Sequence, residues 1–244
     1  SGAEGRISVD DVEEDEKGLL SGRTTGAAAP AAPPLPDFSR WGEIERKPMD
    51  QVRKITARRM AQAWSDVPMV TQFDRADITD IERLRREQRE EAEAAGGRLT
   101  LTALLVKTVA GALKTFPRFN ASVDMARGEI VYKHYIHIGV AVDSDRGLVV
   151  PVVRDVACKN AIEVSVELER LIGAAREGRL APDDMQGGTF TISNAGALGG
   201  DVFTPIVNWP QAAILGIGRA RMEPVYRDGS FEPRQMLPLG LTYD

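Results

Sequence analysis

Apolar residues recur along this chain with two different periods, and each period predicts one kind of secondary structure. In residues 136–142, isoleucine and valine alternate with His, Gly and Ala, which is the period of two expected of a half-buried strand. In residues 101–116 the apolar positions follow helical spacing over a broad face, which predicts a core helix that Pro117 ends. Helices and strands are therefore both expected.

Capping and turn residues place the remaining elements. The residues whose type and position favour the start of a helix are Asp50, Asp77, Thr100 and Asn160. A helix is expected after each of them, the second reaching the glycines at 96–97 and the fourth ending at Gly178. Strands are expected at residues 67–73, 148–153, 189–192 and 213–219. Asp228-Gly229 is a strong two-residue turn signal and predicts a β-hairpin near the end of the chain.

The first 40 residues differ in composition from the rest and are expected to form a separate region. They hold eight acidic and four basic side chains, a net charge of −4 within the chain's total of −5. Alanine and proline are dense between residues 27 and 34, which predicts that residues 17–40 form a semi-rigid, extended linker. Residues 1–16 are too few to fold alone, and the main domain is expected to occupy residues 41–244.

Charge, hydropathy and cysteine content argue against several classes of function. Residues 41–244 are close to neutral and carry no basic face, so nucleic acid is not an expected partner. No apolar run approaches the length of a membrane span, and no signal peptide precedes the first residues, so a membrane is not expected either. The single cysteine excludes an intrachain disulfide and fits a reducing compartment. No cluster of metal ligands is found, so no metal is expected.

The first candidate for chemistry is the segment 187–200, in which a short β-rich run ends in Ser193-Asn194 and then in a glycine-rich tract. Glycine is used where the backbone takes positive φ or lies close against another group. A serine hydroxyl at the end of a strand, flanked by such backbone, is well placed to donate a hydrogen bond to a developing oxyanion. Taken alone, the same motif also fits an ordinary strand-to-loop junction.

Two histidines and one cysteine are the other candidates. His134 and His137 are the only residues of their type, so a general base within this chain would have to be one of them. His137 lies in the alternating segment, which favours a hydrogen-bonded structural histidine. Cys158 precedes Lys159 in a polar connection, but adjacency in sequence is weak support for a reactive thiol.

Three further segments accompany the serine motif: Thr-Pro-Ile-Val-Asn at 204–208, Ala-Ile-Leu-Gly-Ile-Gly at 213–218, and Met-Leu-Pro-Leu-Gly-Leu-Thr-Tyr-Asp at 236–244. With the serine motif, they resemble the catalytic domain of the dihydrolipoamide acyltransferases, the core subunits of 2-oxoacid dehydrogenase complexes. The resemblance runs from about Pro48 to the last residue. It implies an α/β fold like that of chloramphenicol acetyltransferase, with a mixed sheet flanked by helices.

The resemblance also implies roles for particular residues. Ser193 aligns with the serine that donates a hydrogen bond to the oxyanion. Asn194, Arg53 and Asp244 are implied as weaker, substrate-binding or site-ordering residues. In that family a catalytic histidine directly follows the Tyr-Asp pair, which here ends the chain. Residues 41–244 are thus expected to be a catalytic domain that is incomplete at its C-terminus and inactive as given, and residues 1–16 the tail of a peripheral-subunit-binding domain.

The activity implied is that of a dihydrolipoyllysine-residue acyltransferase, which moves an acyl group from a dihydrolipoyl group to coenzyme A. The segment 199–205 favours acetyl as the acyl group. The lipoyl group would be carried on a separate domain outside this chain. The implied partners are two further copies in a homotrimer that builds a larger core, a 2-oxoacid decarboxylase and a dihydrolipoamide dehydrogenase, in a bacterial cytoplasm or a mitochondrial matrix. Two alternatives remain: a succinyl- or branched-chain acyltransferase, and a non-catalytic scaffold subunit that lacks the histidine.

Overall fold

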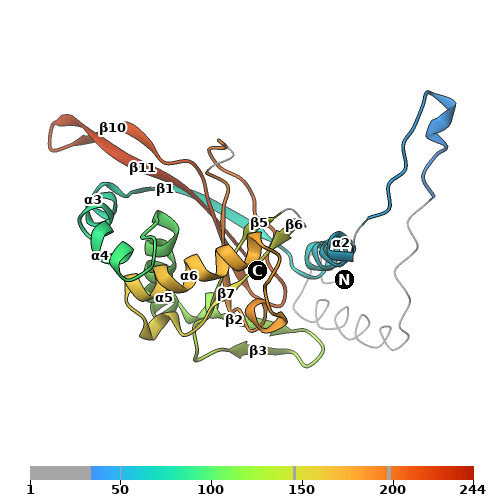
Figure 1. The fold of residues 1–244 in the computed structure, drawn as a ribbon, viewed down its shortest axis with the longest axis horizontal. Helices are drawn as coiled ribbons and strands as arrows, with labels where there is room; N and C mark the ends of the chain where they lie inside the picture. The colour runs from blue at the N-terminus through green and yellow to red at the C-terminus, as the bar shows by residue number, and fades with distance from the viewer. Residues whose placement is uncertain (1–33, 50, 145–146, 197–198) are drawn as a thin grey trace, which may run out of the picture. The chain divides into compact units, whose positions relative to one another are not determined.

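The computed structural model describes residues 34–49, 51–144, 147–196 and 199–244. The chain divides into two units, residues 1–48 and 49–244, and the second carries the fold (Figure 1). The predicted binding-domain tail, most of the predicted linker and the expected cap Asp50 lie outside the described residues. Residues 34–48 are exposed, and their regular structure is the short 3₁₀ helix η2 (Phe38–Arg40).

A seven-stranded mixed sheet forms the centre of the second unit. Its order is β1-β11-β9-β8-β4-β7, and β10 pairs with β11. The strands are β1 (Val70–Asp77), β4 (Ile138–Val140), β7 (Val152–Val153), β8 (Phe190–Asn194), β9 (Ala213–Ile217), β10 (Arg221–Arg227) and β11 (Ser230–Tyr243). Strand β8 runs parallel to both of its neighbours, and the other pairings are antiparallel. The expected α/β fold, a mixed sheet with helices against it, is confirmed.

Helices cover one face of this sheet, as Figure 1 shows. They are α3 (Thr79–Glu87), α4 (Arg89–Ala94), α5 (Leu101–Thr115) and α6 (Ala161–Arg176), while α2 (Gln51–Asp66) precedes β1. The main core lies between α5, α6 and the sheet, where Val106 and Leu171 pack with Ile138, Ile192 and Ile217. The other face carries a smaller cluster of Val67, Val207 and Ile214. The described helices include none long and apolar enough to cross a membrane.

Local signals placed several element ends correctly. The Thr100 hydroxyl accepts a hydrogen bond from the Ala103 amide (3.1 Å) at the start of α5, which ends at Thr115, just before Pro117. Asn160 forms a reciprocal capping box with Glu163 at the start of α6. Residues 228 and 229 both have positive φ (47° and 89°), as a two-residue hairpin turn between β10 and β11 requires.

Four expectations about element boundaries were wrong. The strand predicted at 148–153 is divided, because residues 147–149 pair in a separate hairpin and only β7 joins the main sheet. The helix predicted after Asp77 is two helices, and the break at Gln88 lets Ala92 reach a cluster with Leu99 and Leu104. The strand predicted at 67–73 begins at Val70 and reaches Asp77, because it pairs with β11 along its whole length. The strand predicted at 136–142 stops at Val140, because the chain then enters a separate hairpin of β5 (Val142–Ser144) and β6 (Gly147–Val149).

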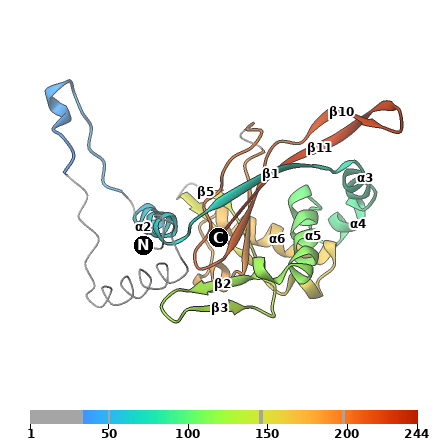
Figure 2. The ribbon, with the colours of Figure 1, turned by 180° about the vertical axis from the view of Figure 1, so that it is seen from behind.

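One hairpin was not anticipated from the sequence. Strands β2 (Ala121–Asp124) and β3 (Glu129–Tyr132) form a two-stranded sheet after the 3₁₀ helix η3 (Pro117–Asn120), and Figure 2 shows it from behind. Two further 3₁₀ helices, η4 (Val156–Cys158) and η5 (Pro182–Met185), flank α6 in the sequence. The hairpin is joined to the rest of the unit by the bond from the Ala212 amide to the Ala121 carbonyl (3.1 Å).

Candidate active site

Ser193 lies near the end of β8, in a row of the sheet that continues through two glycines to Phe73 of β1. It pairs with Gly216 of β9, and Gly216 pairs with Gly240 of β11. Paired residues point to the same face of a sheet. Because glycine has no side chain, Gly216 and Gly240 leave that face bare next to Ser193. The half-buried serine therefore has open sheet beside it.

The segment around Phe203 occupies the space that the two glycines leave, and the Phe73 ring of β1 shares the part over Gly240. A β-carbon at Gly216 would lie 3.1 Å from Cζ of Phe203, and one at Gly240 would lie 2.9 Å from the Phe203 carbonyl oxygen. The segment thus rests on the sheet face that carries Ser193, and forms a wall along this part of the strand. Among the described residues, the Ser193 hydroxyl has no hydrogen-bond partner, so it is available to donate to a ligand.

Polar contacts hold the far end of the same segment. Thr191 lies two residues before Ser193 and therefore points to the same face. Its hydroxyl donates a hydrogen bond to Oε1 of Gln211 (2.7 Å) and accepts one from Nδ2 of Asn208 (3.5 Å). Thr191 and Gln211 are 1% and 5% exposed. Gln211 was not singled out in the sequence, because a lone glutamine twenty residues away carries no local signal.

Asn194 points away from Ser193. Successive residues of a strand face opposite sides, so the Asn194 side chain enters the helical layer. Its Nδ2 donates to the Thr102 hydroxyl at the start of α5 (3.0 Å), and its Oδ1 accepts from the Gly196 amide (2.9 Å). These contacts fix the turn after β8 against the helix. Binding of substrate by Asn194 stays a prediction.

Asp244 directly follows β11, and Arg53 lies on α2. The Asp244 amide donates to the Ala212 carbonyl (3.0 Å), beside the beginning of β9. Four residues separate Asp244 from Gly240, the member of β11 in the Ser193 row, which is about 13 Å along a strand. Arg53 is an exposed residue of α2. The predicted roles of these two residues stay predictions.

His137 is held by backbone groups, as the interpretation of a structural histidine requires. Its Nδ1 accepts a hydrogen bond from the Asp155 amide (3.0 Å). Its carbonyl oxygen accepts from the Thr189 amide (2.7 Å). Thr189 precedes Ser193 by four strand residues, about 13 Å. The histidine is thus structural and too distant to serve Ser193 as a base.

Cys158 lacks the surroundings of a reactive thiol. It is exposed at the end of η4, but the neighbouring ammonium of Lys159 is paired with Oε2 of Glu167 (2.7 Å) and donates to the Arg154 carbonyl. The positive charge of Lys159 therefore interacts with Glu167 and the Arg154 carbonyl and not with the Cys158 thiol. In the part of the chain that the structure describes, no group of three or more His, Cys, Asp or Glu residues is arranged to hold a metal ion.

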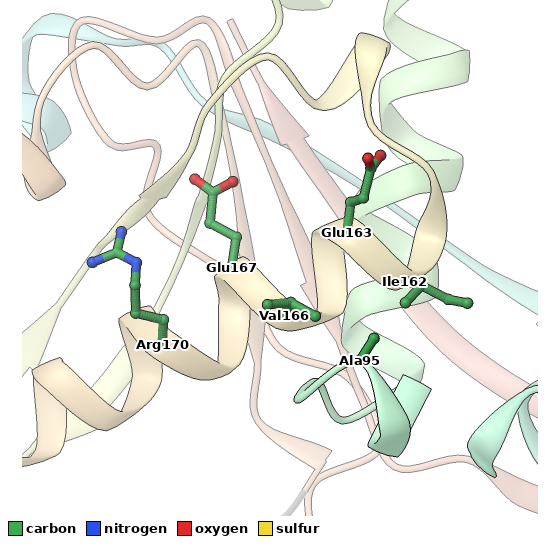
Figure 3. Close-up of a pocket in the computed structure, with 6 residues that line it drawn as sticks. All are labelled: Ala95, Ile162, Glu163, Val166, Glu167 and Arg170. Atoms are coloured by element: carbon green, nitrogen blue, oxygen red, sulfur yellow. The ribbon is translucent and has the colours of Figure 1, made fainter. Parts of the chain in front are cut away.

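A cavity of about 570 Å³ lies on the helical layer, between α6 and the end of α4 (Figure 3). Its lining is Ala95, Ile162, Glu163, Val166, Glu167 and Arg170. Each charged group has an internal partner: the Asn160 amide for Glu163, Lys159 for Glu167 and Asp184 for Arg170. The cavity is thus an apolar depression whose charged edge groups are all engaged by neighbours, on the opposite side of the sheet from Ser193.

Comparison with known proteins identifies the domain. The family model described as 2-oxoacid dehydrogenases acyltransferase (catalytic domain) matches residues 42–244. The dihydrolipoyllysine-residue acetyltransferase component of the pyruvate dehydrogenase complex of Pseudomonas aeruginosa is 44% identical over 251 residues, which cover 100% of this chain and 46% of the relative. The component of the same name from Azotobacter vinelandii is 44% identical, over 100% of this chain and 39% of the relative. The chain thus spans less than half the length of these relatives.

Solved structures give the same result. One, described as a study of a serine, a histidine and an asparagine in the catalytic mechanism of Azotobacter vinelandii dihydrolipoamide acetyltransferase, has a TM-score of 0.84 and 47% identity, and the match covers 87% of this chain and 88% of that one. Another, described as the cubic core of the pyruvate dehydrogenase multienzyme complex, has a TM-score of 0.84 and 46% identity over the same shares. This chain belongs to the family of 2-oxoacid dehydrogenase acyltransferase catalytic domains.

Proposed function

We propose that this chain supplies the oxyanion-binding half of the active site of a dihydrolipoyllysine-residue acetyltransferase. The protein of which it is part would transfer an acetyl group from an S-acetyl-dihydrolipoyl group to coenzyme A. The observation that carries this proposal is the hydroxyl of Ser193, half-buried at the end of β8, beside a wall formed by the Phe203 segment and without an internal hydrogen-bond partner among the described residues. The names of the relatives favour acetyl over other acyl groups.

The chemistry requires a donor for the negative charge that develops on the thioester oxygen. The sulfur of coenzyme A, after losing its proton to a base, forms a bond to the thioester carbon. The carbonyl electron pair moves to oxygen, where the Ser193 hydroxyl donates a hydrogen bond. Collapse of this intermediate breaks the bond to the dihydrolipoyl sulfur, which takes up a proton. Ser193 therefore acts mainly in the transition state, when the oxygen is charged.

The base of this reaction would come from a second copy of the chain. The family resemblance implies a histidine directly after Asp244. The strand β11 runs away from the Ser193 row at that point, and Asp244 already lies about 13 Å along the sheet from it. A histidine at position 245 would thus be too far from Ser193 of its own chain. This separation supports an active site shared between subunits, as the implied homotrimer would have.

The remaining parts of the assembly are inferred from the relatives. The solved structure described as a cubic core of the pyruvate dehydrogenase multienzyme complex supports a core made of many copies. A lipoyl group on a separate domain would bring the acetyl group to this core. A 2-oxoacid decarboxylase would load that group, and a dihydrolipoamide dehydrogenase would reoxidise it.

The test is Ser193→Ala in the full-length natural protein. Transfer of acetyl from acetyl-CoA to dihydrolipoamide should lose a factor of roughly 10²–10³ in kcat, because one oxyanion donor is removed, while KM for acetyl-CoA changes little. Ser165→Ala is the matched control: its hydroxyl, fully buried on α6, bonds the Ile162 carbonyl on the other side of the sheet. The control should retain kcat. A loss below about threefold in Ser193→Ala would contradict the proposal.

A further inference from the structure

We propose that Gln211 is a positioning residue for Ser193, acting through its buried hydrogen bond to Thr191 and through the wall segment that it anchors. This inference rests on the proposed role of Ser193. The wall segment is defined here as residues 203–211. One of its ends covers Gly216 and Gly240 in the Ser193 row, and the other end bonds to Thr191 in the neighbouring row on the same face.

The anchor is a polar pair with little access to water. Thr191 is 1% exposed and Gln211 is 5% exposed, and the atoms Oγ1 and Oε1 are 2.7 Å apart. Water cannot readily replace either partner at such burial, so the bond selects one arrangement of the segment. The Asn208 side chain reaches the same Thr191 hydroxyl (3.5 Å), which gives the segment a second attachment.

The backbone around the anchor is shaped to admit the glutamine. A β-carbon at Gly188 would lie 2.9 Å from Nε2 of Gln211, so the glycine leaves the space in which the amide sits. The backbone amide of Gln211 donates to the Asn208 carbonyl (3.1 Å). The backbone amide of Ala212 donates to the carbonyl of Ala121 in the β2–β3 hairpin. Gln211 is thus fixed from both its side chain and its backbone.

Both ends of this wall segment contact neighbours of Ser193 on the same face of the sheet. Thr191 precedes Ser193 by two residues on the same face, and the Phe203 end lies over the glycines that pair in the Ser193 row. A movement of the wall segment would therefore change the space around the Ser193 hydroxyl. Oxyanion donors act at about 2.7–3.1 Å from the developing charge, and a misplacement of about 1 Å can cost roughly 10² in rate.

The experiment is a double-mutant cycle in the full-length protein, with acetyl transfer from acetyl-CoA to dihydrolipoamide as the assay. Gln211→Met and Thr191→Val each remove the bond while keeping the approximate size of the side chain. Each should lower kcat by about 10- to 100-fold with KM within about threefold. Thr191→Ser keeps the hydroxyl and should retain most of kcat. Ser165→Ala controls for the loss of a buried hydrogen bond far from Ser193.

The cycle separates positioning from a merely structural role. Combined with Ser193→Ala, Gln211→Met should cause no further loss of kcat, because its effect passes through the hydroxyl that is already absent. Multiplicative losses in the double variant, or a loss below threefold in both Gln211→Met and Thr191→Val, would overturn the inference. If Ser193→Ala itself leaves kcat unchanged, the proposed function fails instead, and the two failures are thereby distinguished.

Discussion

Asp77 shows how much a single residue can connect in this domain. It ends β1, and its carboxylate accepts hydrogen bonds from the amide (3.0 Å) and hydroxyl (2.7 Å) of Thr79 at the start of α3. The same carboxylate pairs with Arg234 (2.7 Å) and Arg227 (3.2 Å) of the β10–β11 hairpin. A strand, a helix and a hairpin thus meet at one carboxylate. The bonds from Thr79, followed by those from Arg234, lower the pKa of Asp77 to about 2.

Asp77→Asn should therefore destabilise the domain in a pH-dependent way. The pKa of Asp77 is lower in the folded than in the unfolded chain, so its charge stabilises the fold above about pH 4. That contribution should disappear as the pH falls toward 2. Near neutral pH we expect a loss of about 1–2 kcal/mol in the free energy of unfolding, measured with urea.

The control for this prediction is Asp80→Asn. Asp80 is an exposed residue of α3 that pairs with Arg83 in the adjacent turn (3.1 Å), and such surface pairs contribute little. Its removal should change the unfolding free energy by less than about 0.5 kcal/mol. An Asp77→Asn deficit of equal size at pH 2.5 and pH 6 would show that the charge is not responsible.

The role of a single residue could be predicted when its partner lies close to it along the chain. The roles of Thr100 and Asn160 as caps could be read from the sequence because their partners lie three residues away. The contact between Thr191 and Gln211 could not, because it exists only once β8 and the wall segment have packed together. Ser193 was recognised through a family motif. Its neighbours on the sheet could be identified only from the register of three strands.

The loop that contains Asp201 packs so closely against the end of β9 that only glycine fits at the contact. Gly218 follows β9, and its amide donates to the Pro238 carbonyl of β11 (2.9 Å). A β-carbon at Gly218 would lie only 1.8 Å from the Asp201 carbonyl oxygen. This oxygen belongs to the backbone, so no rotation of a side chain could remove the overlap.

Gly218→Ala should thus force the chain at Asp201 away from β9. We expect a loss of about 1–3 kcal/mol in unfolding free energy, the range typical of overpacking, measured by urea or thermal unfolding. Gly111→Ala is the matched control, since this glycine lies exposed within α5 and a β-carbon there would meet nothing within 4 Å. The control should be neutral or more stable by up to about 1 kcal/mol. Equal stability of both variants would refute the argument.

A helix or strand could be predicted well where its own pattern of apolar residues and caps sets its limits. Helices α5 and α6 were expected with nearly their observed limits, because their apolar faces and caps agree. Strand β1 was misplaced because its long pairing with β11 sets its length. The β2–β3 hairpin was missed because its strand β3 is exposed at every position, so it lacks the alternation that reveals a half-buried strand.

The molecule as a whole leaves large apolar side chains uncovered. On the β10–β11 hairpin, Met222, Tyr226 and Phe231 are 62%, 63% and 72% exposed. Their register puts them on one face, with the paired prolines 224 and 233 between them, while the other face carries most of the charges. Exposed apolar patches of this kind are typical of surfaces that other chains cover.

The prediction at the scale of the whole molecule concerns its assembly, and it rests on the exposed apolar residues of the β10–β11 hairpin and on the proposed active site shared between subunits. We expect the chain of residues 1–244 to form trimers in solution at micromolar concentration, with a mass near three times 26.6 kDa by multi-angle light scattering. The physical reasons are the uncovered apolar residues and the distance between Ser193 and the end of β11. A monomer at these concentrations would argue against both. Ser165→Ala should leave the mass unchanged, because its side chain is fully buried on the helical layer.

The row formed by Ser193, Gly216 and Gly240 also limits how the protein can be redesigned. An engineer who wishes to admit a bulkier acyl chain beside the serine would first look for side chains to trim. Gly216 and Gly240 already have none, and no coded amino acid is smaller. Atoms that can be removed belong to the wall segment, at Phe203 and Pro205 over Gly216, and to β1, where the Phe73 ring lies against Gly240. Libraries aimed at a broader acyl range should therefore vary the wall segment and Phe73, and leave Gly216 and Gly240 untouched.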